Sequence, residues 1–133
     1  MTIQGLDHVS LRTADVDRLT EWYDRVIGLR AGRRPDFDFP GAWLYAGDQP
    51  VVHLIGADAP PGADPEDLRI QHFSFRAEGL AGFLDRLRSE GASWRIGRLP
   101  GDGFGDVLVN LTDVDGNHLH VDFPAAEAEG LDL

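Results

Sequence analysis

The sequence contains no cysteine, no lysine and no long run of hydrophobic residues. Without cysteine, neither a disulfide bond nor a thiolate metal ligand can form, and this agrees with a cytoplasmic protein. No segment approaches the ~20 consecutive apolar residues of a membrane-spanning helix, so we expect no membrane partner. The first residues lack the basic and apolar regions of a secretory signal. These absences predict a cytoplasmic location.

All 12 positive side chains are arginines, against 23 aspartates and glutamates, and the net charge is −11. Nucleic-acid binding requires clustered lysine and arginine, so nucleic acid is excluded as an expected partner. Part of the acidic excess lies in a tail, residues 125–133, which has no pattern that would fold on its own. With 133 residues, of which 42% are hydrophobic, the chain can form one domain with a substantial core.

Two segments, residues 6–13 and 70–77, resemble each other at an offset of 64 residues. In the first copy Val9 and Leu11 alternate with polar residues, and the second copy repeats this pattern. Alternation with a period of two is typical of a strand with one face on the core. The two segments therefore predict matching strands in a duplicated chain.

An amphipathic helix is predicted after each of these strands. The first runs from an N-cap at Asp15 to Gly28, and the second ends at Gly91. The helical apolar positions are Val16, Leu19, Tyr23 and Val26 in the first helix, and Leu80, Phe83, Leu84 and Leu87 in the second. Further strands are predicted over residues 42–46, 51–55, 93–98, 107–111 and 118–123, with a weaker one over 29–34.

Proline, glycine and aspartate are concentrated in residues 57–68, which predict a linker. The chain thus divides into a first module (5–56), the linker, a second module (69–124) and the acidic tail. Both modules have the order strand, helix, several strands. One module cannot bury its sheet face alone, so the two should pair in one α+β domain.

Four of the five histidines fall at matching places in this repeat. His8 and His72 occupy the same position in the two opening segments. His53 and His120 lie in the last strand of each module. If the modules are related by approximate two-fold symmetry, the four imidazoles can converge on one divalent metal ion. Imidazole nitrogen binds nickel, iron, zinc and manganese ions with different affinities. The histidines therefore do not identify the ion.

A single strand histidine is more often a hydrogen-bonded residue of the interior than a metal ligand. The symmetric placement of four histidines favours the metal. His118 shares the strand face of His120, so on strand parity alone these two residues could exchange roles.

Three stretches resemble the vicinal oxygen chelate superfamily, which includes glyoxalases, bleomycin resistance proteins and extradiol dioxygenases. Residues 6–9 resemble the opening strand with its first metal ligand. Residues 21–29 resemble the helix end written F-Y-x-x-x-L-G-L. Residues 113–120 resemble D-P-D-G-N-x-I-E, with Val114 in place of proline. The resemblance covers about residues 5–124.

The resemblance implies two paired βαβββ modules forming a curved, partly open mixed sheet around a metal, with helices on the outer face. It implies that His8, His53, His72 and His120 are the metal ligands, and it favours His120 over His118. It also implies a homodimer, whose sites lie within one chain or between two subunits.

The resemblance implies a metal-dependent enzyme acting on a small-molecule substrate with adjacent oxygens, through glyoxalase-like lyase or isomerase chemistry and a metal-stabilised enolate. The alternatives are a ring-cleaving dioxygenase, a fosfomycin-type transferase and a bleomycin-resistance-like protein that sequesters a ligand without catalysis. The family's glyoxalases commonly have glutamate where this chain has His53 and His120. Four neutral imidazoles leave the full +2 charge of the ion, which should favour an anionic substrate.

Other polar residues on the histidine face are expected to contact substrate or move a proton. His118 or Asp122, which flank His120, could supply the base that the missing carboxylates would have provided. Arg12 and Asn110 are candidate substrate-binding residues. Trp43 and Tyr45 lie on a strand that could line a cavity or the core.

Overall fold

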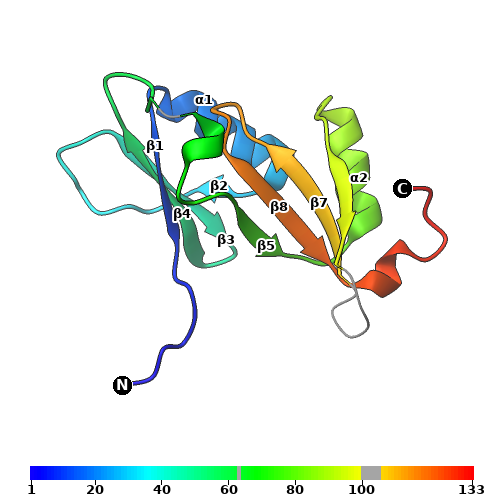
Figure 1. Ribbon diagram of the computed structural model, residues 1–133. Helices are drawn as coiled ribbons and strands as arrows, with labels where there is room; N and C mark the ends of the chain where they lie inside the picture. Colours follow the sequence, from blue (N-terminus) through cyan, green and yellow to red (C-terminus); the bar gives the residue numbers. More distant parts are fainter. Residues whose placement is uncertain (63, 100–105) are drawn as a thin grey trace. The chain divides into compact units, whose positions relative to one another are not determined.

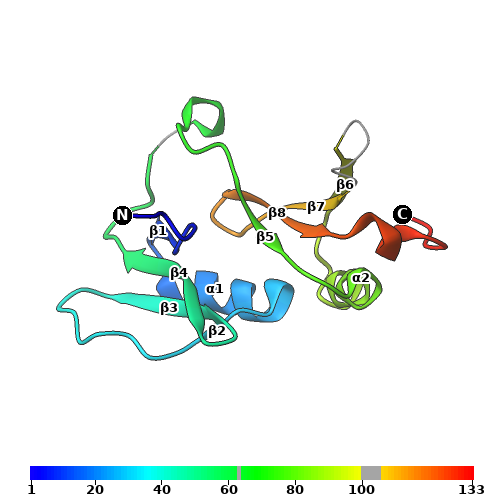
Figure 2. The same cartoon turned by 90° about the horizontal axis from the view of Figure 1, so that it is seen from below.

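The computed structural model describes residues 1–62, 64–99 and 106–133, and its backbone forms two compact units, Met1–Ala63 and Asp64–Leu133. The boundary falls inside the predicted linker. Each unit contains one α-helix and one four-stranded mixed sheet, which confirms the predicted α+β class and the two βαβββ modules (Figures 1 and 2). In the described part of the chain, no helix is long and apolar enough to cross a bilayer.

The first unit contains the sheet β1-β4-β3-β2. Its strands are β1 (Val9–Thr13), β2 (Arg30–Ala31), β3 (Gly41–Ala46) and β4 (Gln49–Gly56). β1 is parallel to β4, whereas the other neighbours are antiparallel. The weak strand expected over 29–34 is therefore only two residues long.

The second unit repeats this topology with the sheet β5-β8-β7-β6. Its strands are β5 (Phe73–Arg76), β6 (Arg95–Arg98), β7 (Val107–Thr112) and β8 (His118–Phe123). β5 is parallel to β8, and β8 matches the predicted strand at both ends. The opening strands of both units begin one residue later than the histidine that was expected to lie in them, so His8 and His72 directly precede β1 and β5.

Each sheet buries one face against a helix. In the first unit, Leu44 and Val52 are fully buried, together with Leu19 of α1 (Val16–Trp22). In the second, Phe123 lies 5.4 Å from Phe83 of α2 (Leu80–Ser89), measured between ring centroids. Because side chains alternate along a strand, the opposite face of each sheet holds the histidines.

The first helix is shorter than predicted, because a π-helical turn, η1 (Tyr23–Ile27), replaces its last part. The amide groups of Gly28 and Leu29 both donate to the Tyr23 carbonyl, over 2.8 and 3.0 Å. Gly28 has φ +91°, a conformation that glycine adopts without a side-chain clash, and it ends the turn as predicted.

The turn before β8 is organised by the buried carboxylate of Asp113. One oxygen accepts from the amides of Asp115 and Asn117, each over 2.9 Å, and the other accepts from the Asn117 side chain. Gly116 has φ +91° in this turn. These bonds fix the point at which β8, with its two histidines, enters the sheet.

The acidic tail is more ordered than its composition predicts. Residues Ala125–Ala128 form a 3₁₀ turn, and the Glu127 carboxylate accepts from the amides of Gly79 and Leu80 over 2.8 and 2.6 Å. Gly79 is the N-cap of α2 and has no side chain, so a residue from the tail satisfies the helix terminus instead. The remaining 3₁₀ turn, Pro65–Asp67, lies in the linker.

Candidate metal-binding histidines

In the first unit, the structure brings His8 and His53 into contact. The parallel pairing of β1 and β4 aligns Ser10 with His53, and His8 lies two residues before Ser10. The two imidazoles stack with centroids 3.7 Å apart and planes at 12°. Trp43, the antiparallel partner of His53 on β3, also stacks on the His53 ring, at 4.1 Å.

The second unit brings its histidines together through the same register. β5 aligns Ser74 with His120, and His72 lies two residues before Ser74. The His72 and His120 rings have centroids 4.6 Å apart. The His118 ring lies 5.2 Å from His72 and 6.3 Å from His120. The predicted repeat symmetry of the four histidines is therefore present in the strand pairing of each unit.

Three of the four predicted ligands share one hydrogen-bonding arrangement. The Nδ1 atom of His8 lies 2.6 Å from an Asp7 carboxylate oxygen. Nδ1 of His72 contacts the Gln71 side-chain oxygen, and Nδ1 of His120 contacts the Asp122 carboxylate. Each oxygen accepts a hydrogen bond from Nδ1–H, so in the neutral ring the lone pair is on Nε2. Metal-binding histidines in proteins are commonly oriented by such an acceptor on the second ring nitrogen.

His72 is held by a longer chain of hydrogen bonds with one consistent direction. The Asn110 amide nitrogen donates to the Arg95 carbonyl over 3.3 Å, and its oxygen accepts from Nε2 of His118 over 2.9 Å. The Gln71 amide donates to Nδ1 of His118 over 3.2 Å, and the Gln71 oxygen accepts from His72. The chain thus specifies the His72 tautomer that leaves Nε2 available.

The environment of two histidines favours their neutral form. Burial lowers the pKa of His53, and the neighbouring His8 lowers it further. Burial also lowers the pKa of His118, with added contributions from His72 and His120. A neutral imidazole is the form that binds a metal or accepts a proton.

The donor chemistry of the four residues fits a divalent ion, but the pairs differ in geometry. With metal–nitrogen bonds of ~2.0–2.1 Å, two imidazoles on neighbouring positions of one ion have centroids on the order of 5 Å apart. The His72–His120 pair, at 4.6 Å, is close to this spacing. In the other pair, Nε2 of His53 lies 3.0 Å from the Pro50 carbonyl, so it binds a metal only after that bond is released. Within the described ranges, no group of three histidine, aspartate or glutamate side chains is assembled as a metal site.

The other predicted residues lie on the histidine faces. Arg12 is exposed on β1, where it aligns with Ile55. Asn110 aligns with His120, and its amide is engaged by His118 and by two carbonyls, those of Arg95 and Leu108. Their contact with a substrate stays a prediction, as does proton transfer by His118, whose ring nitrogens are both hydrogen-bonded.

Sequence reasoning missed two of the three acceptors that orient the histidines, and it named the third, Asp122, only as a possible base. Asp7 and Gln71 occupy equivalent positions in the two opening segments, each directly before a histidine. A hydrogen-bond acceptor conserved in type between the two copies was the signal that could have found them. Arg95 gave no such signal, because only the pairing of β6 with β7 brings it beside Asn110.

Comparisons with known proteins agree with the fold and the repeat. Residues 5–121 match the model of the Glyoxalase/Bleomycin resistance protein/Dioxygenase superfamily. The glyoxylase/bleomycin resistance protein/dioxygenase domain from Frankia sp. EAN1pec has a similar fold, with a TM-score of 0.75, 23% identity and coverage of 98% of this chain and 96% of that one.

Two curated relatives come from Arabidopsis thaliana. The protein named Glyoxylase I 4 is 30% identical over 99 residues, and the match covers 69% of this chain and 55% of the relative. A lactoylglutathione lyase is 26% identical over 116 residues, and the match covers 82% of this chain and 40% of the relative. The chain therefore spans about half the length of these relatives.

The two βαβββ units, the matched histidine positions and the family match together define a vicinal oxygen chelate fold. The chain belongs to the Glyoxalase/Bleomycin resistance protein/Dioxygenase superfamily.

Proposed function

We propose that His8, His53, His72 and His120 bind one divalent metal ion, with one pair supplied by each module. The two pairs come from one chain or from two subunits of a homodimer. The observation that carries this proposal is the shared orientation of His8, His72 and His120, in which a side-chain oxygen holds Nδ1 and leaves Nε2 free. Such support is expected for ligands and is not needed by imidazoles that only fill space.

We further propose that the protein is a lyase or isomerase of the glyoxalase type, which acts on a small molecule with two adjacent oxygens. Family membership and the two Arabidopsis relatives support this reaction class. A divalent ion would supply Lewis-acid polarisation of the substrate oxygens, with nickel, iron, zinc and manganese as the candidates.

The chain's own residues have separate tasks in this proposal. The four imidazoles are neutral ligands, so they leave the charge of the ion to attract an anionic substrate. Proton transfer falls to His118 or Asp122, next to His120. The lowered pKa of His118 favours its neutral form, and Nδ1 can take a proton once the Gln71 amide moves away. Arg12, exposed on β1, would bind an anionic group of the substrate.

Metal content measured by elemental mass spectrometry tests the ligand set. Tag-free protein is reconstituted with each candidate ion, desalted and compared with the variants His72→Ala/His120→Ala and His8→Ala/His53→Ala. Ser10→Ala/Ser74→Ala is the matched control, because it changes one residue in each opening strand, aligned with His53 and His120, that is not a proposed ligand. We expect about one ion per site in the parent and the control, and loss in both double variants.

Metal retained at full stoichiometry in either double variant would refute the ligand set. The reaction class is tested separately in two activity assays. One follows turnover of lactoylglutathione, the compound in the name of one relative, and the other follows ring cleavage of a catechol. Turnover of lactoylglutathione supports the glyoxalase type. Iron-dependent cleavage of the catechol ring would instead support the dioxygenase and contradict the proposed lyase or isomerase.

A further inference from the structure

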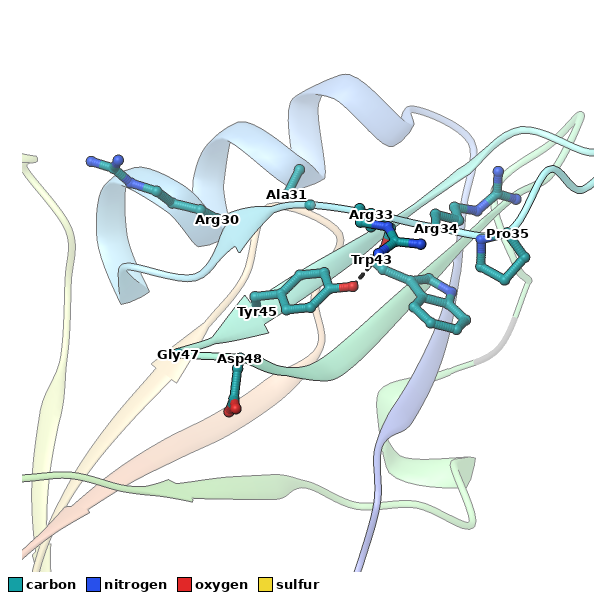
Figure 3. A pocket seen from close by; sticks show the side chains of 10 residues that line it. Arg30, Ala31, Arg33, Arg34, Pro35, Trp43, Tyr45, Gly47 and Asp48 are labelled. Atoms are coloured by element: carbon teal, nitrogen blue, oxygen red, sulfur yellow. Dashed lines mark hydrogen bonds between the residues drawn. The ribbon is translucent and has the colours of Figure 1, made fainter.

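A cavity of about 730 Å³ lies in the first unit, and none of the four predicted metal ligands lines it. All its lining residues belong to β2, β3 or the segments that follow these strands, residues 30–35, 43, 45, 47 and 48 (Figure 3). Its volume falls in the range of small-molecule sites, ~300–1,000 Å³. The residues on its wall combine arginine side chains with two aromatic rings.

The aromatic wall depends on a glycine. A Cβ atom at Gly32 would lie 2.7 Å from two carbons of the Tyr45 ring. Only glycine therefore allows the ring to pack directly against the backbone at this position. The Tyr45 hydroxyl then donates to the Arg33 carbonyl over 2.6 Å, as the dashed line in Figure 3 shows. The Tyr45 ring is thereby held by its packing over Gly32 and by the bond of its hydroxyl to Arg33.

Three arginines and one aspartate line the cavity of a protein whose net charge is −11. Arg34 is already engaged, because it donates to the Phe39 carbonyl over 2.8 Å and its guanidinium lies 4.9 Å from the Phe37 and Phe39 rings. Arg30 lies 3.7 Å from Asp24. Among the described residues, the Arg33 guanidinium has no ion-pair or hydrogen-bond partner. It is therefore available to an external anion.

Trp43 connects this cavity with the histidine pair of the first unit. It lines the cavity, and its ring also stacks on His53 at 4.1 Å and 11°. The stack on His53 holds the indole in place, so it offers a rigid flat surface to a ligand. Rigid aromatic surfaces favour planar apolar groups.

We propose that this cavity is a binding site for a small aromatic carboxylate, with its carboxylate on Arg33 and its ring on Trp43 and Tyr45. The guanidinium group matches the geometry of a carboxylate. A phosphate is the less suitable anion, because no lining residue belongs to a helix whose amino terminus could receive it. The site does not require the metal centre, so its occupancy can be measured in metal-free protein.

Isothermal titration with 2-naphthoate tests the proposal on metal-free and metal-loaded protein. The amide signals of Gly32 and Gly47 and the Trp43 indole signal, assigned with Trp43→Phe, locate the ligand by NMR. We expect a Kd at or below about 1 mM for a ligand of this size. We expect Arg33→Gln to raise the Kd roughly fivefold or more, because it removes a charge-assisted bond.

Gly32→Ala forces the Tyr45 ring to move and should weaken binding by at least as much, without removing a charge. Arg86→Gln is the matched control, because it makes the same charge change at an exposed position of α2. Circular dichroism checks that each variant is folded.

Binding that is lost in Arg33→Gln and Gly32→Ala but unchanged in Arg86→Gln supports the site. Three results overturn it. They are no binding of 2-naphthoate, equal affinity for the neutral 2-naphthalenemethanol, and equal affinity for acetate, which lacks a ring.

Discussion

Asp122 and Asp7 make the same contact with a proposed ligand, yet we predict that their removal has different effects on metal affinity. Asp122 holds Nδ1 of His120, and Asp7 holds Nδ1 of His8. In the first pair, the His120 side chain is 11% exposed and the Asp122 side chain is 15% exposed. In the second pair, the His8 side chain is 36% exposed and the Asp7 side chain is 84% exposed. The chemistry is matched, so the comparison isolates burial.

The magnitudes follow from solvent screening. In the buried pair of Asp122 and His120, removal of the carboxylate leaves the His120 N–H without an acceptor. Loss of such a supporting bond reduces metal affinity ~10–100-fold. In the exposed pair, water replaces the carboxylate, and exposed ion pairs contribute ~0–1 kcal/mol. We therefore expect Asp122→Ala to weaken zinc binding ~10–100-fold, and Asp7→Ala to weaken it at most about fivefold.

Competition between the protein and a chromophoric chelator measures the zinc affinity of both variants and of the parent. His120→Ala is included as the loss of the ligand itself, and circular dichroism confirms folding. Equal effects of the two aspartate variants would refute the argument from burial. If His120→Ala binds zinc as tightly as the parent, the placement of the ligand itself is wrong.

Three further predictions concern other parts of the molecule. Asn110→Leu should break the chain of hydrogen bonds that orients His72, changing its tautomer in ¹⁵N NMR and weakening zinc binding ~10-fold or less. Glu127→Ala should lower the free energy of unfolding by ~0.5–2 kcal/mol in urea denaturation, because two amide groups at the start of α2 lose their acceptor. Leu119→Ala should lower it by ~2–5 kcal/mol, because this fully buried side chain leaves a cavity.

The first two of these predictions have a nearby control. Ser74→Ala, on the same face of the second sheet, should leave the His72 tautomer unchanged. Glu129→Ala removes an exposed tail carboxylate and should change stability by less than about 0.5 kcal/mol. An unchanged tautomer in Asn110→Leu, or equal stability losses from the two glutamate variants, would contradict the corresponding argument.

The candidate site could be predicted in part because its residues follow the repeat. The equal spacing of His8 and His72 from their strands is a property of the sequence, and parallel pairing then places each beside a histidine of the last strand. The partners of the imidazoles were harder to predict. The bond between His118 and Asn110 joins adjacent strands, and which side chains meet depends on the register of the sheet.

Sequence alone determined the duplicated α+β organisation, the positions of most strands and the end of the first helical segment at Gly28. These features depend on local periodicity and on the conformational preference of glycine, which act over a few residues. Only the tertiary structure decided that the acidic tail caps α2, that Tyr45 closes over Gly32, and that Gln71 links His72 to His118. Each of these contacts joins residues distant in sequence, and its formation depends on the packing of whole elements.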